Sequence, residues 1–97
     1  MNLIWAPLAM DRVVEIAAYI AEDNPVAAEK WIRDVFARTG QLVLFPQSGR
    51  HIPESARRDL RELILGNYRI IYRIRAEQVA VLTIRHTKQT LPLEDLK

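Results

Sequence analysis

Three polar side chains in the second half of the chain are of the types that acid–base chemistry on a phosphate requires: Glu62, Arg69 and His86. A carboxylate accepts a proton, and an imidazole with its ordinary pKa of about 6.5 donates one at neutral pH. An arginine stabilises the extra negative charge of a pentacovalent phosphate. Such a set would cleave a phosphodiester without a metal, provided that the fold brings the three groups together.

The second half of the chain has the pattern of three β-strands joined by tight turns. The strands span Leu60–Leu65, Tyr68–Arg75 and Val79–Thr87. Gly66-Asn67 is a strong signal for a two-residue hairpin turn, and Ala76-Glu77 is a weaker one. The pattern therefore predicts an antiparallel sheet of consecutive strands.

Two-residue turns would fix which side chains share a face of this sheet. Glu62 then lies opposite Ile71. Arg69 lies opposite Ile84 and is diagonal to both Glu62 and His86, within reach of long side chains. This register predicts that the three polar groups project together from one exposed face. A purely structural interpretation is a cross-strand ion pair between Glu62 and Arg69, with His86 simply ending its strand.

The same alternation divides the remaining strand residues between the two faces. The more continuous apolar face is the one that we expect helices to cover: Leu63, Leu65, Tyr68, Ile70, Tyr72, Ile74, Val79 and Val81, with Arg61 and Arg85 at its margins. The face that carries the polar groups collects Leu60, Glu62, Ile64, Arg69, Ile71, Arg73, Leu82, Ile84 and His86.

The first half of the chain supplies the covering elements. Residues 1–5 form a short β-prone run, and apolar residues at helical spacing predict a helix over 7–21. Asn24 is a good N-cap for a second helix, which begins at Pro25. Its apolar stripe runs to Phe45, although Gly40 permits a break.

The predicted order is β-α-α-β-β-β, which is an α+β fold with two helices on one face of an antiparallel sheet. Residues 46–53 form a loop by their proline and glycine content. Residues 1–97 are expected to form one domain, in which 89–97 is a polar C-terminal tail.

Composition excludes several classes of function. No apolar run reaches the roughly 18–20 residues of a membrane helix. The chain also lacks a basic segment followed by an apolar one, so its sequence does not predict export. Cysteine is absent and histidine occurs twice. Disulfides and thiol catalysis are therefore excluded, no metal or other cofactor is expected, and a cytoplasmic location is favoured.

Charge is uneven along the chain. Residues 1–48 carry a net charge of −2 and residues 49–97 one of +4, and the chain has eleven arginines but three lysines. Arginine suits forked contacts to phosphate and carboxylate. The second half is therefore expected to meet an anionic partner.

Several short segments occur in a fixed order along the chain: Asn24-Pro25-Val26-Ala27-Ala28, Pro46-Gln47-Ser48-Gly49-Arg50, Arg61-Glu62-Leu63, the strand Tyr68–Ile74 and Ile84-Arg85-His86. Together they resemble the RelE/ParE superfamily of type II toxin–antitoxin toxins, and the resemblance covers residues 1 to about 88. It implies a cytoplasmic bacterial toxin, of the kind that stabilises plasmids, which arrests growth until an antitoxin neutralises it. The first two segments are closest to ParE.

The superfamily implies two activities. ParE-like members are similar to inhibitors that bind DNA gyrase, whereas RelE-like and YoeB-like members are similar to ribonucleases that cut mRNA on the ribosome. Arg69 and His86 match an arginine and a histidine of the ribonucleases. Thr87 stands where YoeB-like members end in a catalytic tyrosine, and the loop after the second helix lacks the RelE-like lysines, offering only Arg50, His51 and Glu54.

These departures favour gyrase inhibition by protein–protein binding. The alternatives are an mRNA interferase, with Arg69 as the phosphate clamp and His86 and Glu62 as proton carriers, and a decayed toxin that only binds its antitoxin. All three imply an acidic, partly disordered antitoxin segment, with operator DNA bound only through the antitoxin. The residues expected to contact target or antitoxin are Arg50, Arg58, Arg61, Arg73, Ile71, Leu82, Ile84 and Lys88.

Overall fold

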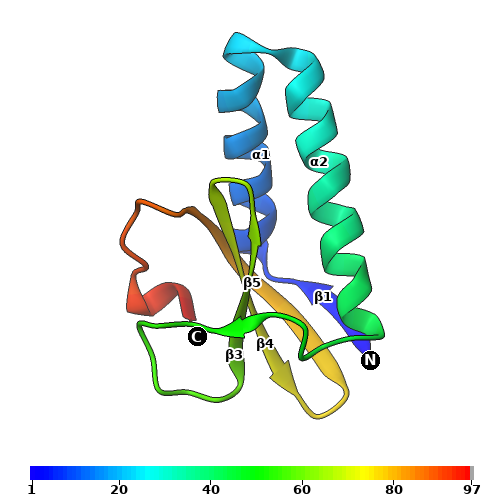
Figure 1. The fold of residues 1–97 in the computed structure, drawn as a ribbon, viewed down its shortest axis with the longest axis vertical. Helices are drawn as coiled ribbons and strands as arrows, with labels where there is room; N and C mark the ends of the chain where they lie inside the picture. The colour runs from blue at the N-terminus through cyan, green and yellow to red at the C-terminus, as the bar shows by residue number, and fades with distance from the viewer. Residues whose placement is uncertain (97) are drawn as a thin grey trace.

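The computed structural model describes residues 1–96, and its elements follow the predicted order (Figure 1). They are β1 Asn2–Trp5, α1 Pro7–Asp23, α2 Pro25–Gly40, the 3₁₀ turn η1 Gln41–Val43, β2 Arg50–His51, β3 Leu60–Leu65, β4 Tyr68–Arg75, β5 Gln78–His86 and the 3₁₀ turn η2 Leu93–Leu96. None of the helices within this part of the chain is long and apolar enough to span a membrane.

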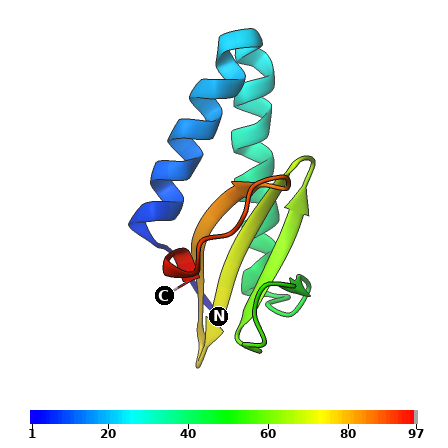
Figure 2. The ribbon, with the colours of Figure 1, turned by 90° about the vertical axis from the view of Figure 1, so that its left-hand side faces the viewer.

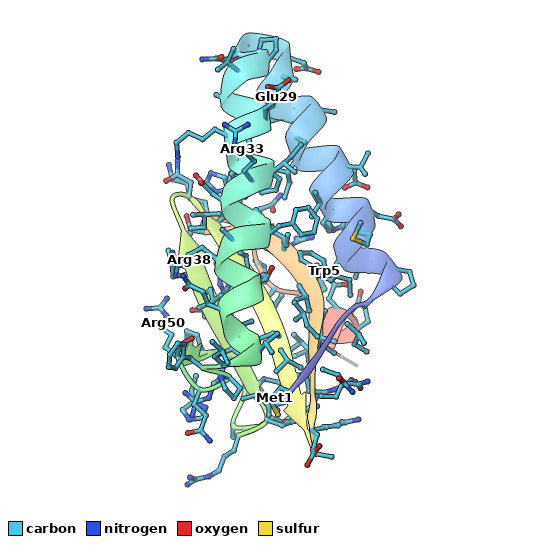
Figure 3. All side chains as sticks on the ribbon, turned by 90° about the vertical axis from the view of Figure 1, so that its right-hand side faces the viewer. Met1, Trp5, Glu29, Arg33, Arg38 and Arg50 are labelled. Atoms are coloured by element: carbon cyan, nitrogen blue, oxygen red, sulfur yellow. The ribbon has the colours of Figure 1, made fainter. Side chains whose placement is uncertain are left out.

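The five strands form one sheet in the order β1-β5-β4-β3-β2. β1 runs parallel to β5, and the other neighbours are antiparallel. The two helices lie together on one face, where α2 stands in front of the sheet in Figure 3. The α+β architecture predicted from the sequence is therefore confirmed, and β2 is the one short edge strand that the pattern did not predict.

Local sequence explains where the helices begin and end. The Asn24 side chain accepts a hydrogen bond from the Ala27 N–H at 3.0 Å, and Pro25 occupies the first turn of α2. α2 ends at Gly40, the residue that permitted a break, and the chain tightens into η1 instead of continuing as α-helix to Phe45. Val13, Trp31 and Val35 pack their buried side chains between the helices and the sheet.

A β-bulge in β5 changes the register that two-residue turns predict. Between β4 and β5, Tyr72 pairs with Val81 but Ile71 pairs with Thr83, so one extra residue is inserted into β5. Every pair beyond it shifts by one. Arg69 lies opposite Arg85 instead of Ile84, and the predicted pairing is wrong at this point.

The shift exchanges the faces of the last three residues of β5. Ile84 joins the core beneath the helices, where it is 1% exposed, and His86 turns toward α1. Arg85 moves to the opposite face and donates to the Thr90 carbonyl at 3.0 Å. The expectation that Ile84 and His86 share a face with Arg69 is therefore wrong.

The face away from the helices is covered as well. A second apolar cluster forms there from Ile52, Leu60, Ile71, Ala80, Leu82, Leu91 and Leu96. The C-terminal segment, drawn in orange to red, crosses in front of the sheet in Figure 2. The predicted polar tail thus contributes two buried leucines, and the expectation that Ile71, Leu82 and Ile84 form an exposed patch is wrong because all three are buried.

Gly49 anchors the loop before β2 to the sheet. Its N–H donates to the Tyr72 hydroxyl at 2.9 Å, and that hydroxyl donates to the Pro46 carbonyl at 2.7 Å. A Cβ atom on Gly49 would lie 2.5 Å from the Glu62 carbonyl oxygen. Only glycine therefore permits this close approach of the two backbones.

Substituting Gly49 and Gly40 in turn should distinguish a glycine required by a close backbone contact from one that lies in a helix. Gly49→Ala should lower the free energy of unfolding by about 1–3 kcal/mol, because the Glu62 backbone has no freedom to move away. Gly40→Ala is the matched control: no atom lies within 4 Å of its Cβ position, and helix propensity predicts a gain of about 0.5–1 kcal/mol. Urea unfolding of both variants measures the difference, and equal effects would contradict this account.

Candidate functional site

Four charged side chains form a continuous network on the sheet face away from the helices. Glu62 on β3 accepts from Arg69 Nε on β4 at 2.6 Å and from Arg50 Nε on β2 at 2.6 Å, one bond to each carboxylate oxygen. Arg69 then donates both terminal nitrogens to Glu54, at 2.5 and 2.7 Å. The predicted proximity of Glu62 and Arg69 is confirmed, and it takes the form of an ion-pair network.

Burial increases from the rim of this network toward its centre. The side chain of Glu62 is fully buried and that of Arg69 is 8% exposed, while Glu54 is 30% and Arg50 65% exposed. Two positive and two negative charges balance one another. The hydrogen bonds from Arg69 hold the pKa of the Glu54 carboxyl below its ordinary value.

This arrangement leaves Arg69 little capacity to bind a phosphate. Its Nε and both terminal nitrogens already donate to carboxylates. A phosphate would have to displace Glu54 and would then approach the buried charge of Glu62. The network is suited to holding strands and loop together, since buried charges must be paired to be tolerated.

His86 lies on the other side of the sheet. Its ring meets that of Tyr68 edge-on, with centroids 5.4 Å apart, and its Nδ1 accepts from the Lys88 N–H at 3.1 Å. A pocket of about 320 Å³ opens beside it, and its lining includes Arg12 and Tyr19 of α1. Burial raises the pKa of the Tyr68 hydroxyl. Glu62, Arg69 and His86 therefore do not form one site, and the prediction that they converge is wrong.

The remaining candidates differ in their surroundings. Arg50, Arg58 and Lys88 are exposed. Arg61 is half-buried and donates to the carbonyls of Gln47 and Gly49, so it supports the loop. Arg73 is half-buried near the end of β4, and Ile71, Leu82 and Ile84 belong to the two cores.

Two features of the surface are not evident from the sequence. Glu54, the carboxylate that occupies Arg69, comes from a loop whose position no periodicity specifies. Four exposed apolar side chains lie on the second half of α2 or just after its end, and we define them as the α2-end patch: Phe36, Val43, Leu44 and Phe45. Leu44 and Phe45 are 76% and 62% exposed.

Within residues 1–96, no group of three or more histidine, aspartate or glutamate side chains is placed to hold a metal.

Comparison with known proteins agrees with this fold. The family model described as "ParE toxin of type II toxin-antitoxin system, parDE" matches residues 3–91. The protein named "Putative toxin Y4kP" of Sinorhizobium fredii (strain NBRC 101917 / NGR234) is 36% identical over 90 residues, which cover 91% of this chain and 90% of that protein. A chain in the solved structure "Chromosomal ParDE TA system from P. aeruginosa" has the same fold: the TM-score is 0.72 at 22% identity, covering 89% of this chain and 95% of that one.

These findings define the class of protein, which is the toxin component of a type II toxin–antitoxin system. Within that class the chain belongs to the ParE toxin family. The resemblance to the RelE/ParE superfamily, and to its ParE branch, is confirmed.

Removing Arg69 should destabilise the protein far more than removing an exposed cation. Arg69→Ala leaves Glu62 buried with only Arg50 as a partner, so the free energy of unfolding should fall by roughly 3 kcal/mol. Lys30→Ala is the matched control, because the Lys30–Asp34 pair is also 2.6 Å long but exposed, and its loss should cost less than about 0.5 kcal/mol. Similar losses in urea unfolding would contradict a stabilising network.

The lowered pKa of Glu54 makes stability depend on pH. Its folded-state pKa lies below the ordinary value of 4.5, so its contribution is complete above about pH 5 and is lost as pH falls through the folded pKa. Glu54→Gln should therefore be less stable than the wild-type chain at pH 7. The two urea midpoints should converge as pH falls from 7 through this lowered pKa, because a protonated Glu54 no longer pairs with Arg69. A constant difference across this range would argue against the Glu54–Arg69 ion pair.

Proposed function

We propose that this ParE-family toxin arrests growth by binding DNA gyrase, without catalysis of its own, and that a cognate antitoxin neutralises it. The observation that carries the non-catalytic reading is the occupancy of Arg69 by two carboxylates. The choice of gyrase as the target rests on the resemblance to ParE-like members, and the ParE family match supports that branch.

The geometry supports this proposal over ribonuclease activity. An interferase needs a free arginine at the scissile phosphate and a proton carrier within about 3 Å of the reacting atoms. Arg69 is neutralised, and His86 is on the opposite face of the sheet beside α1. A toxin that acts by binding a protein needs an exposed contact surface. The apolar side chains of the α2-end patch offer one.

We assign the gyrase contact to the α2-end patch. Val43, Leu44 and Phe45 follow one another in the chain, and Phe36 lies two turns earlier on α2. Exposed apolar side chains this close together along the chain favour protein–protein contact. The antitoxin segment, expected to be acidic, would then neutralise the toxin by covering this surface or by restricting access to it.

Supercoiling of relaxed plasmid by purified gyrase tests the proposal. The wild-type chain should inhibit at micromolar concentration, and its antitoxin peptide should restore activity. Leu44→Asp should weaken inhibition at least tenfold, because a charge would be buried at the interface. Val26→Asp is the matched control, since Val26 is 74% exposed at the far end of α2, and it should inhibit like the wild-type chain.

A second variant separates inhibition from cleavage. His86→Ala should retain full inhibition of gyrase, and mRNA on translating ribosomes should stay intact with the wild-type chain. Unaffected gyrase together with cut mRNA that requires His86 would replace the proposed function with the interferase.

A further inference from the structure

One end of the sheet carries a row of arginine side chains, with His51 among them, that the proposed gyrase contact does not use. We define the arginine edge as Arg50, His51, Arg57, Arg58 and Arg75, which come from β2, the loop before β3 and the end of β4. In Figure 1 these segments lie at the end of the sheet opposite the tip of the helical hairpin. Figure 3 shows Arg50 projecting outward at this edge.

Short contacts link several members of the arginine edge. Asp59 accepts from Arg57 at 2.8 and 3.1 Å and lies 3.5 Å from Arg75 Nε. Arg57 also donates to the Leu96 carbonyl at 2.9 Å, which fixes its position. His51 and Arg58 line one hollow of about 290 Å³ together with Ser55 and Arg57.

Two carboxylates of this region, Glu62 and Asp59, are less exposed than the arginines with which they pair. Glu62 is fully buried while its partner Arg50 is 65% exposed, and Asp59 is 28% exposed while Arg75 is 60% exposed. Arg50 uses only its Nε for Glu62, and its two terminal nitrogens make no hydrogen bond within residues 1–96. The surface that a partner meets is therefore more positive than the residue count alone suggests.

Apolar anchors are absent from this edge. No large hydrophobic side chain between residues 46 and 63 is exposed. A peptide that folds into a groove needs such anchors, whereas a sugar–phosphate backbone is bound by charge and forked hydrogen bonds alone. Guanidinium groups suit phosphate oxygens in particular. The surface therefore fits a nucleic acid better than an acidic polypeptide.

We propose that the arginine edge binds the phosphate backbone of duplex DNA without sequence preference. This inference rests on the proposed function for its role: the toxin would hold the DNA segment on which gyrase acts while the α2-end patch contacts the enzyme. It adds a direct DNA contact to the operator binding expected through the antitoxin, and it requires no antitoxin.

Fluorescence anisotropy with a labelled 24-bp DNA duplex tests the contact. If about three phosphates are neutralised, log K should fall with log salt at a slope of about −2.7, so that binding weakens about 40-fold between 50 and 200 mM salt. The double variant Arg58→Glu/Arg75→Glu should reduce the slope by about 2 and the affinity at 50 mM salt at least tenfold. The single variant Arg58→Glu, at an exposed side chain without an ion pair in residues 1–96, should reduce the slope by about 1.

Arg33→Glu is the matched control, since Arg33 is exposed on α2, away from Arg50 in Figure 3. It should bind DNA within twofold of the wild-type chain, and circular dichroism should show that all variants are folded. Three results would overturn the inference: no binding at 50 mM salt, an equal loss with Arg33→Glu, or equal competition by polyglutamate of matched charge. At least tenfold tighter binding to a 24-bp RNA duplex would assign the edge to RNA instead.

The two proposals fail in different assays. A chain that inhibits gyrase but does not bind the duplex would refute the DNA contact and leave the proposed function intact. A chain that binds the duplex through Arg58 but leaves gyrase unaffected would support the DNA contact and refute gyrase as the target.

Discussion

The buried carboxylate of Glu62 is the constraint on which the helix-free face of this molecule depends. An unpaired charge at that position would cost several kcal/mol, and both of its oxygens are therefore bound by arginines. The Arg50–Glu62 pair holds β2 to the sheet. The Arg69–Glu54 pair holds the loop between β2 and β3 to the same face. The short edge strand and an irregular loop are thus held by charge, because a two-residue strand contributes little backbone pairing of its own.

The same network decides what this face can do chemically. Pairing makes Arg69 a structural group, and the positive charge that remains available lies at the rim, on Arg50 and its neighbours at the arginine edge. On the other face, His86 lies against Tyr68 and α1 without a carboxylate of the network near it. The sheet therefore separates His86 from Arg69, and the groups predicted to act together on a phosphate do not share a face.

The pairing of strands could be read from the sequence only where a turn specifies it. Gly66-Asn67 fixes the register of β3 and β4, so the contact of Glu62 with Arg69 was predictable. The bulge in β5 lies among residues 80–83, where side chains on both faces of the strand are buried. In such a run, alternation of apolar and polar residues cannot reveal a shift in register. One inserted residue was enough to move His86 to the helix side.

The periodicity of the sequence also could not predict which residues of irregular segments pack against the sheet. Leu91 and Leu96 have no repeat that marks them as core, and Glu54 sits in a loop, yet these residues close the face that the pattern leaves open. What the sequence does show is the surplus of arginine in the second half. The structure sorts that surplus by burial: Glu62 is buried and pairs with both Arg69 and Arg50, Arg69 is buried with it, and Arg50 faces solvent. In the two proposals above, this charged edge would bind DNA and the apolar α2-end patch, made from a different part of the chain, would bind gyrase.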